Sequence, residues 1–227
     1  NAYEVTKDLK EGVILAVETL ANEALYWWKQ NNNIPVSDYT DDKFEGEVKD
    51  DCLTIIYRLL FLFYAESRDE LEILPVDDEV YKLGYSLESL RDLEMVRLNS
   101  EESRNGYFFD DSIRHLFSLL SDGHNANTSN LYIKSFRVRP IDSPLFNNKN
   151  LNHLADVRIR NIKWQEIIKA LSLSKKKNYC GRISYANLGV NQLGSVYESL
   201  LAFRGFYAEE DYIEVHKANE PQDGTFL

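Results

Sequence analysis

Cysteine, proline and glycine are all scarce in this chain, which has 2, 5 and 10 of them among its 227 residues. Two cysteines, Cys52 and Cys180, are too few for the disulfide framework of a small secreted protein, so we expect a reducing, cytoplasmic environment. The low proline and glycine content excludes a loop-rich or low-complexity chain. The 44% hydrophobic share, with 14 tyrosines and 11 phenylalanines, instead predicts a globular protein with a large aromatic core.

Long hydrophobic runs are also missing. The longest nearly apolar stretch, Leu53 to Ala65, is too short to cross a bilayer and carries Arg58 near its middle. We find no signal peptide, so no membrane partner is expected. Asn1 and Ala2 are interpreted as the remnant of a cleaved expression tag.

Motifs for catalysis or cofactor binding are absent as well. The chain has no phosphate-binding loop, no dinucleotide-binding glycine motif and no nucleophile elbow. Its four histidines, His115, His124, His153 and His216, do not stand at metal-ligand spacing from one another or from cysteine. We therefore expect no catalytic residue, no metal site and no cofactor site within this chain.

One acidic stretch keeps a nuclease open as an alternative. Glu47 and Lys49 form an E-x-K pair, with Asp42 upstream, and such groups can hold a divalent metal that activates water for phosphodiester cleavage. This chemistry needs the E-x-K pair on a β-strand. Here the pair opens a predicted helix, where acidic residues also favour the helix dipole.

Charge is distributed unevenly along the chain, whose formal net charge is −11. Residues 1–133 hold 12 Lys and Arg against 27 Asp and Glu, a charge of −15. Residues 134–182 hold 12 against 3, a charge of +9, and residues 183–227 hold 2 against 7, a charge of −5. The acidic total argues against general coating of nucleic acid, whereas the basic middle block is suited to face phosphate.

The basic block supplies the candidate contacts with a DNA backbone. Arginines alternate with apolar residues in two places, so that each pair points to one side of an extended segment. The candidates are Arg137, Arg139, Arg158, Arg160, Lys163, Lys175, Lys176 and Lys177. The same side chains could instead pair with the acidic half of the chain, and the sequence leaves both possibilities open.

Apolar periodicity predicts a mainly α-helical fold. Helices are expected over about 5–30, 45–67 and 86–93, in a segment capped by Asp110 or Asp111, in the stretch beginning at Asn161, and around residues 190–203. The stretch "NSEESRNG" and the lysine run at 175–177 are expected to be loops, and a small β-hairpin in the C-terminal third is expected to turn near residues 209–211. We interpret residues 3–130 as an acidic helical subdomain and residues 131–227 as a basic, mixed helical and extended subdomain leading toward a missing catalytic domain.

Three stretches together resemble a known family. They are "LTIIYRLLFLFYAESRDEL" from Leu53, "FRVRPIDSPLF" from Phe136, and "ISYANLGVNQLGSVYESLLAFRGFYAEEDYIEV" from Ile183. Their order and spacing are similar to the helical region that precedes the methyltransferase domain in large DNA adenine methyltransferases of type II restriction–modification and phage-defence systems. The resemblance spans most of the chain from about Lys49 to Val215.

The resemblance implies that the reacting groups lie elsewhere. The family binds S-adenosylmethionine at a glycine-rich strand-to-helix turn and holds the flipped adenine at an (N/D)-P-P-(Y/F) motif, where the base stacks on an aromatic ring. This chain has neither motif, so it is expected to be an excised, inactive connector of a methyltransferase whose partners are DNA and the missing catalytic domain. A stand-alone acidic adaptor or inhibitor domain is the other alternative.

Overall fold

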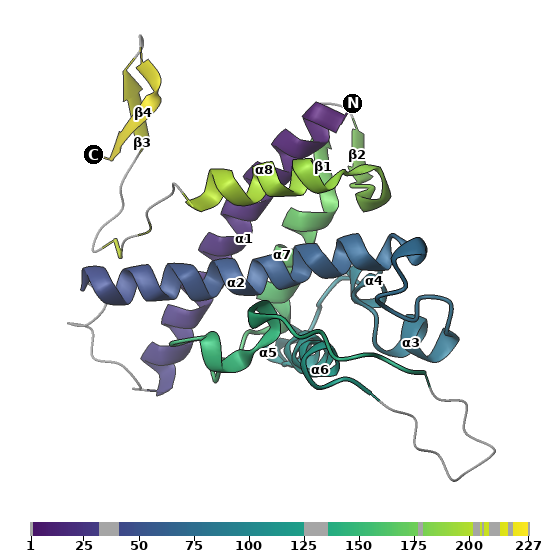
Figure 1. Ribbon diagram of the computed structural model, residues 1–227. Coiled ribbons are helices and arrows are strands. Elements are labelled where there is room, and N and C mark those ends of the chain that lie inside the picture. Colours follow the sequence, from purple (N-terminus) through teal and green to yellow (C-terminus); the bar gives the residue numbers. More distant parts are fainter. Residues whose placement is uncertain are drawn as a thin grey trace.

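The computed structural model describes residues 2–31, 41–124, 136–176, 179–201, 205, 207–208, 214–217 and 220–226. These residues form a mainly helical molecule with short antiparallel hairpins in the C-terminal third, which confirms the expected fold class. Two long helices, α1 (Ala2–Asn31) and α2 (Asp42–Glu66), cross each other and carry the rest of the body (Figure 1).

Helix α1 buries one continuous face. Its fully buried residues recur every three or four positions, as an amphipathic helix requires: Leu9, Val13, Ala16, Leu20 and Ala24. Helix α7 (Asn161–Ser172) packs along this face and contributes Trp164, Ile167, Ile168 and Leu171 to the same core.

Helix α2 is buried nearly all round, as its continuous apolar sequence predicts. Its first turn is capped by Asp41, whose carboxylate accepts a hydrogen bond from the Phe44 backbone N–H at 3.1 Å. Cys52 lies in the middle of the helix and is fully buried in the core.

Helix α6 (Phe108–Asp122) begins earlier than the sequence predicts. We expected Asp110 or Asp111 to cap it, but both residues lie inside its first turn. Asn161 explains the difference, because its side chain accepts a hydrogen bond from the Phe109 N–H and so satisfies an unpaired donor of the first turn. Because Asp110 does not cap the helix, its carboxylate is available for the interior contacts that are described below.

Short helices connect the long ones. Helix α3 (Glu79–Gly84) is followed by α4 (Leu87–Arg91), which Ser86 caps and which lies within the helix expected over 86–93. Helix α5 (Glu101–Asn105) lies in the stretch expected to be a loop, because Ser100 and Ser103 form a reciprocal capping box that stabilises a single helical turn. Single 3-10 turns occur at Asp69–Leu71, Pro144–Phe146, Asn148–Asn150 and Tyr185–Asn187.

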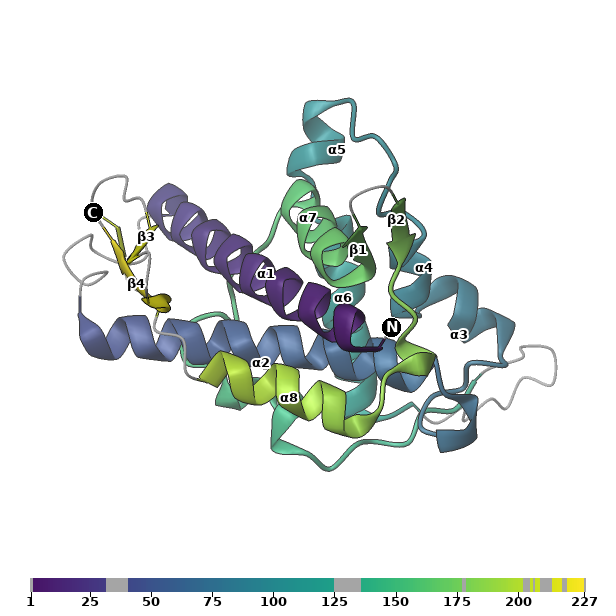
Figure 2. The same cartoon turned by 90° about the horizontal axis from the view of Figure 1, so that it is seen from above.

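Helix α8 (Val190–Leu201), the last helix among the described residues, lies against α1 and beside α2 (Figures 1 and 2). Its inward side chains Val196 and Leu200 are buried, whereas Tyr197 and Leu201 are 44% and 52% exposed. The helix therefore closes the core on one face and presents apolar side chains on the other.

Both described hairpins belong to the C-terminal third. Strand β1 (Leu173–Lys176) pairs antiparallel with β2 (Tyr179–Arg182), so the lysine run starts in a strand rather than in the predicted loop. Strand β3 (Glu214–Lys217) pairs antiparallel with β4 (Glu220–Phe226). The turn predicted near residues 209–211 lies outside the described residues, and the β3–β4 hairpin follows it in the chain.

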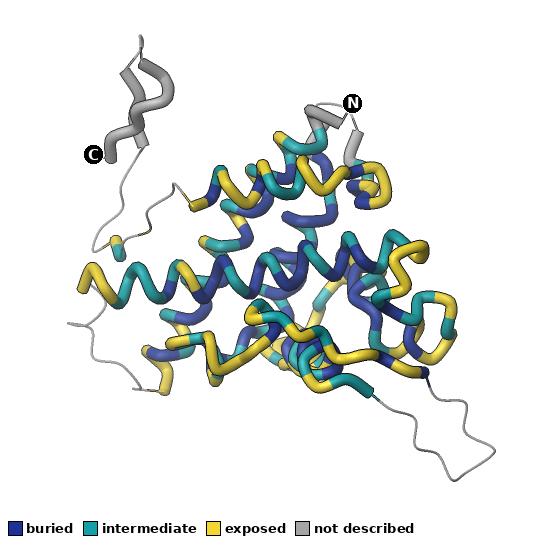
Figure 3. The backbone as a smooth tube through the Cα atoms, in the orientation of Figure 1, coloured by how far each residue is buried: buried dark blue, intermediate teal, exposed yellow. Residues whose placement is uncertain are grey.

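One hydrophobic core joins the acidic and the basic segments of the sequence. Core residues run from Leu9 in α1 to Leu200 in α8, and Figure 3 shows buried backbone wherever the long helices face each other. The change of charge near residue 130 is therefore not a boundary of the core. Within the described residues, no helix has the length and apolar character needed to span a membrane.

Candidate functional site

Arg158, a candidate DNA contact, is bound to acidic residues of α6. Its guanidinium donates to the carboxylates of Asp110 and Asp111, and it lies 4.6 Å from the ring centre of Tyr107. Asp110 is 1% exposed and also accepts hydrogen bonds from Arg114 and, at 3.0 Å, from the indole N–H of Trp164. This arginine therefore helps to neutralise a buried carboxylate, a role that is costly to remove.

Arg160 has the same kind of partner in α1. It donates to both carboxylate oxygens of Glu23, at 2.6 and 2.7 Å, and Glu23 is only 2% exposed. The guanidinium also stacks 3.9 Å from the ring centre of Tyr26. The hydrogen bonds that Arg160 donates to Glu23 raise the pKa of Arg160, and burial opposes that rise. A bidentate, partly buried pair of this kind fixes the position of the residue that precedes α7.

Arg137 and Arg139 have a different setting. Phe136 and Val138 are buried while Arg137 and Arg139 are exposed, so the alternation read from the sequence is present in the structure. Both arginines line a shallow cavity of about 250 Å³ together with acidic residues of the 69–77 segment. Among the four arginine candidates, Arg137 and Arg139 are the exposed ones, and Arg158 and Arg160 are only partly exposed.

Among the lysine candidates, only the side chain of Lys163 belongs to the described part of the structure. Lys163 binds Glu166 one turn along α7 at 2.8 Å, which is an ordinary surface pair. Lys175 and Lys176 lie on β1, but their side chains fall outside the description, and Lys177 lies outside the described residues altogether. The described candidates thus belong to several elements: the extended segments before and after residue 145, α7 and β1.

Two more arginines, not singled out from the sequence, bond across the division between the acidic half and the rest of the chain. Arg182 donates to Glu94 at 2.8 Å and to Asp92 at 2.9 Å. Arg91, only 6% exposed, donates to the carbonyl oxygens of Ile183 and Ser172. Arg158, Arg160 and Arg182 of the basic middle block are therefore all paired with carboxylates of the acidic N-terminal half.

Arg58 is a fully buried cation at the centre of α2. Its guanidinium donates to the carbonyl oxygen of Leu145 and the side chain of Asn148, both at 2.6 Å, and lies 5.2 Å from the centre of the Phe117 ring. Burial lowers the pKa of Arg58 to about 10, so the side chain keeps its charge at neutral pH. Carbonyl and amide oxygens therefore hold the charge and fasten residues 145–148 to α2.

Asp51, two turns before Arg58 on α2, holds the next part of the same segment. Its carboxylate accepts backbone N–H groups of Asn152 at 2.9 Å, His153 at 2.6 Å and Leu154 at 3.0 Å. Asp51 is 1% exposed, and three donors are enough to compensate a buried carboxylate. Asp51 therefore anchors residues 152–154 to α2.

The nuclease candidates lie on a helix and do not converge. Glu47 and Lys49 are two positions apart on α2, so their side chains point to different sides, whereas on a strand they would share a face. Glu47 binds His153 at 2.7 Å and Lys43 at 3.6 Å, and Lys49 pairs with Asp50. The His153 hydrogen bond lowers the pKa of Glu47. In the described part of the chain, no group of three or more side chains is arranged to hold a metal.

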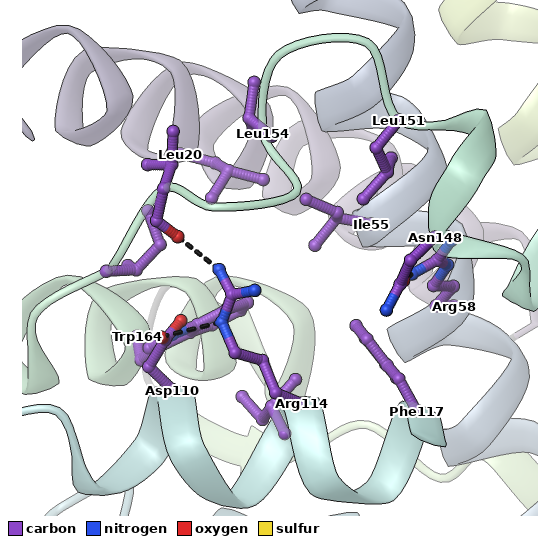
Figure 4. A pocket seen from close by; sticks show the side chains of 13 residues that line it. Leu20, Ile55, Arg58, Asp110, Arg114, Phe117, Asn148, Leu151, Leu154 and Trp164 are labelled. Carbon is purple, nitrogen blue, oxygen red and sulfur yellow. Dashed lines mark hydrogen bonds and ion pairs between the residues drawn. The ribbon is translucent and has the colours of Figure 1, made fainter. Parts of the chain in front are cut away.

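The interior cavity beside Asp110 is too small for a substrate. Figure 4 shows Arg114 and Trp164 at Asp110 and, across the cavity, Arg58 beside Asn148. The volume of this cavity, about 30 Å³, is roughly the space of one water molecule. The polar groups around it are therefore structural, and they hold α2, α6 and α7 in fixed positions.

The three sequence stretches that carry the family resemblance meet in the structure. Arg58 joins the first to the second through Leu145. The hydroxyl of Tyr57 donates to the carbonyl oxygen of Tyr197 at 3.3 Å, and their rings are 4.3 Å apart. Arg68 donates to the carbonyl oxygens of Ala186 and Leu188, at 3.0 and 2.7 Å. Stretches about 90 to 140 positions apart thus form one contiguous structure around α2.

Comparison with family models, curated proteins and solved structures gives no match for this chain.

Proposed function

We propose that this chain is the helical connector that precedes the catalytic domain of a large DNA adenine methyltransferase of a restriction–modification or phage-defence system. The observation that carries the proposal is the meeting of the three resembling stretches around α2, through the contacts of Tyr57, Arg58 and Arg68. Residues shared with a family because they maintain one fold are expected to touch in this way.

The proposed role is structural. Buried hydrogen bonds fix the irregular segment 145–154 to α2, and α7 and α8 are packed onto α1. Such a body can hold a catalytic domain at a constant position relative to DNA without supplying a reacting group. In this role the body positions the catalytic domain relative to DNA and does not itself form or break a bond.

The proposal assigns no S-adenosylmethionine site to this chain. The described strands form only short antiparallel hairpins, and the glycine-rich strand-to-helix turn that the methyltransferase family uses is missing from the sequence. The cofactor belongs, in this proposal, to a domain outside these residues.

The coding sequence provides the most economical test. Downstream of codon 227 in the gene, the proposal expects a glycine-rich strand-to-helix turn followed by an Asn-Pro-Pro-Tyr type motif. A reading frame that stops at this position, or that continues into a domain of another class, would overturn the proposal.

Within the proposal, Arg137 and Arg139 are the best-placed DNA contacts, because both are exposed on one side of an extended segment. Replacing both by alanine should weaken gel-shift binding to duplex DNA and lower its dependence on salt, since two phosphate contacts would be lost. Arg97→Ala with Arg104→Ala, which removes two other exposed arginines, is the matched control. Equal weakening by both variants would contradict a specific contact.

The alternative is an acidic protein-interaction domain. The observation in its favour is that Arg158, Arg160 and Arg182 are already bound to carboxylates of the same chain. This alternative predicts no shift of duplex DNA at any salt concentration, so the same gel separates the two functions.

A further inference from the structure

A cavity of about 180 Å³ lies between α1 and α2, and we call it the α1–α2 cavity. Its walls are mainly apolar, and on α1 they recur every four residues, as one face of a helix does. The apolar residues of the two helices that line it are Val17, Ala21, Leu25, Phe44 and Val48. All of them except Val48 are only half-buried, although α1 and α2 pack against each other. The two helices therefore leave open space between apolar side chains.

Tyr207 closes the α1–α2 cavity on a further side, together with Gly205. The backbone N–H of Tyr207 donates to the carboxylate of Glu45, near the start of α2, at 2.7 Å. The Tyr207 hydroxyl accepts a hydrogen bond from Lys29 in the last turn of α1 at 3.2 Å, and the Lys29 ammonium lies 5.2 Å from the ring centre. This one residue thus connects both helices beside the cavity.

The wall at Phe44 is formed before any ligand binds. The centre of the Phe44 ring lies 5.5 Å from the ring centre of the buried Trp28 and 4.7 Å from that of His153. His153 is fixed in turn, because its backbone N–H donates to Asp51 at 2.6 Å and its ring bonds Glu47 at 2.7 Å. A wall that is already ordered loses little conformational entropy when a ligand arrives.

The polar residues that line the α1–α2 cavity leave its interior apolar. Glu18 and Asn22 are exposed to solvent, so they lie at its mouth. Glu45 and Lys49 each already have a partner. A buried water needs two to four polar partners, and the apolar walls supply none. An apolar group therefore gains more from this space than water does.

The size of the α1–α2 cavity suits a single ring. An apolar cavity of roughly 150 Å³, engineered in another protein, stays dry and takes up benzene. At about 180 Å³, the α1–α2 cavity has room for one aromatic ring with a small substituent. A peptide segment or a fused ring system needs more space than this.

We propose that the α1–α2 cavity binds a small, uncharged monocyclic aromatic molecule. In the complex the ring of the ligand contacts Phe44 and lies beside Tyr207, where offset or edge-on packing of aromatic rings is favourable. Burial of apolar surface supplies the driving force. This site is independent of the proposed connector function, since it uses no residue assigned to DNA or to a catalytic domain.

The test is a titration of the whole chain with toluene. Saturation-transfer NMR should detect binding, and the thermal unfolding temperature should rise with toluene concentration, because the ligand binds only the folded state. Ala21→Phe places a ring in the cavity from α1 and should lower the affinity for toluene at least about tenfold. Ala21→Leu fills less of the space and should cause a smaller loss, which keeps the test usable if the phenylalanine variant does not fold.

Leu15→Phe is the matched control, because it adds a ring to α1 at a position that is 41% exposed and does not line the cavity. This variant should bind toluene as the wild type does. The proposal is overturned if the wild type shows neither saturation transfer nor a rise in unfolding temperature. Equal affinities of the wild type and the folded Ala21 variants would also overturn it, as would a tenfold loss in Leu15→Phe.

Discussion

Single residues decide how closely the helices of this molecule approach. At Gly12, a Cβ atom would lie 2.0 Å from the carbonyl oxygen of Ala170, so the absence of a side chain allows α1 to touch the backbone of α7. Gly46 and Gly194 have open space at the same position. The sequence offered no means of telling these glycines apart, because the difference depends on a helix that follows about 150 residues later.

Gly12→Ala should therefore destabilise the fold, by about 1 to 3 kcal/mol, since the helices must separate to admit the methyl group. Gly46→Ala, in an open position of α2, should instead leave stability unchanged or raise it by up to about 1 kcal/mol, because alanine is the better helix former. Urea unfolding of the two variants measures the difference. Equal effects of both substitutions would show that α1 and α7 do not cross at Gly12.

The partner of each charged side chain could likewise not be predicted from the sequence. Alternating arginines indicated that Arg137 with Arg139 and Arg158 with Arg160 would each share a side, but left DNA contact and internal pairing open. Arg160 and Glu23 are 137 positions apart, and no local pattern links such distant residues. The carboxylates of the fold now account for Arg158 and Arg160, whereas the exposed pair Arg137 and Arg139 remains the candidate for DNA.

At the scale of secondary-structure elements, the long helices could be predicted and the short ones could not. Helices α1, α2 and α7 have several turns of apolar periodicity, and their observed cores match it. Helix α5 has a single turn and no apolar face, so only its serine capping box signals it. The segment 136–160 owes its shape to Arg58 and Asp51 on α2, and these contacts could not be read from its own sequence.

Glu66 joins three elements at the end of α2. Its carboxylate accepts hydrogen bonds from the Tyr81 hydroxyl in α3 and from the N–H groups of Leu87 and Glu88 at the start of α4, at 2.8 to 2.9 Å. Burial raises the pKa of Glu66 to about 7, against the opposing effect of these three hydrogen bonds. The group therefore titrates close to neutral pH.

The direction of the resulting pH dependence follows from linkage. The folded state binds the proton of Glu66 more tightly than the unfolded state, so its contribution to stability is complete below about pH 4.5 and is lost as the pH rises through about 7. Unfolding free energies of the wild type and Glu66→Gln, measured from pH 4 to 8, should differ in slope, with the falling component missing in the variant. Parallel curves would contradict the raised pKa.

For the molecule as a whole, opposite charge and a common core bind the two halves of the sequence together. The acidic segment supplies α1 to α6, and the basic segment supplies α7, which covers the apolar face of α1. Arg158, Arg160 and Arg182 add ion pairs across the same division. We infer that neither half keeps its native packing alone.

A fragment of residues 3–130 should accordingly lose cooperative unfolding and near-ultraviolet circular dichroism, since it would expose Leu9, Val13 and Leu20 to water. The chain of residues 3–227 is the control. A fragment that unfolds cooperatively with native-like tertiary signals would show that the acidic half is an independent domain.

In the proposed role, this body orients a methyltransferase and supplies no reacting group of its own. The most direct measurement is transfer of a labelled methyl group from S-adenosylmethionine to duplex DNA, by the 227-residue chain and by the complete product of its gene. We expect no incorporation with the chain alone and N6-methyladenine with the complete product. Methylation by the chain alone, or a complete product that does not methylate adenine, would contradict it.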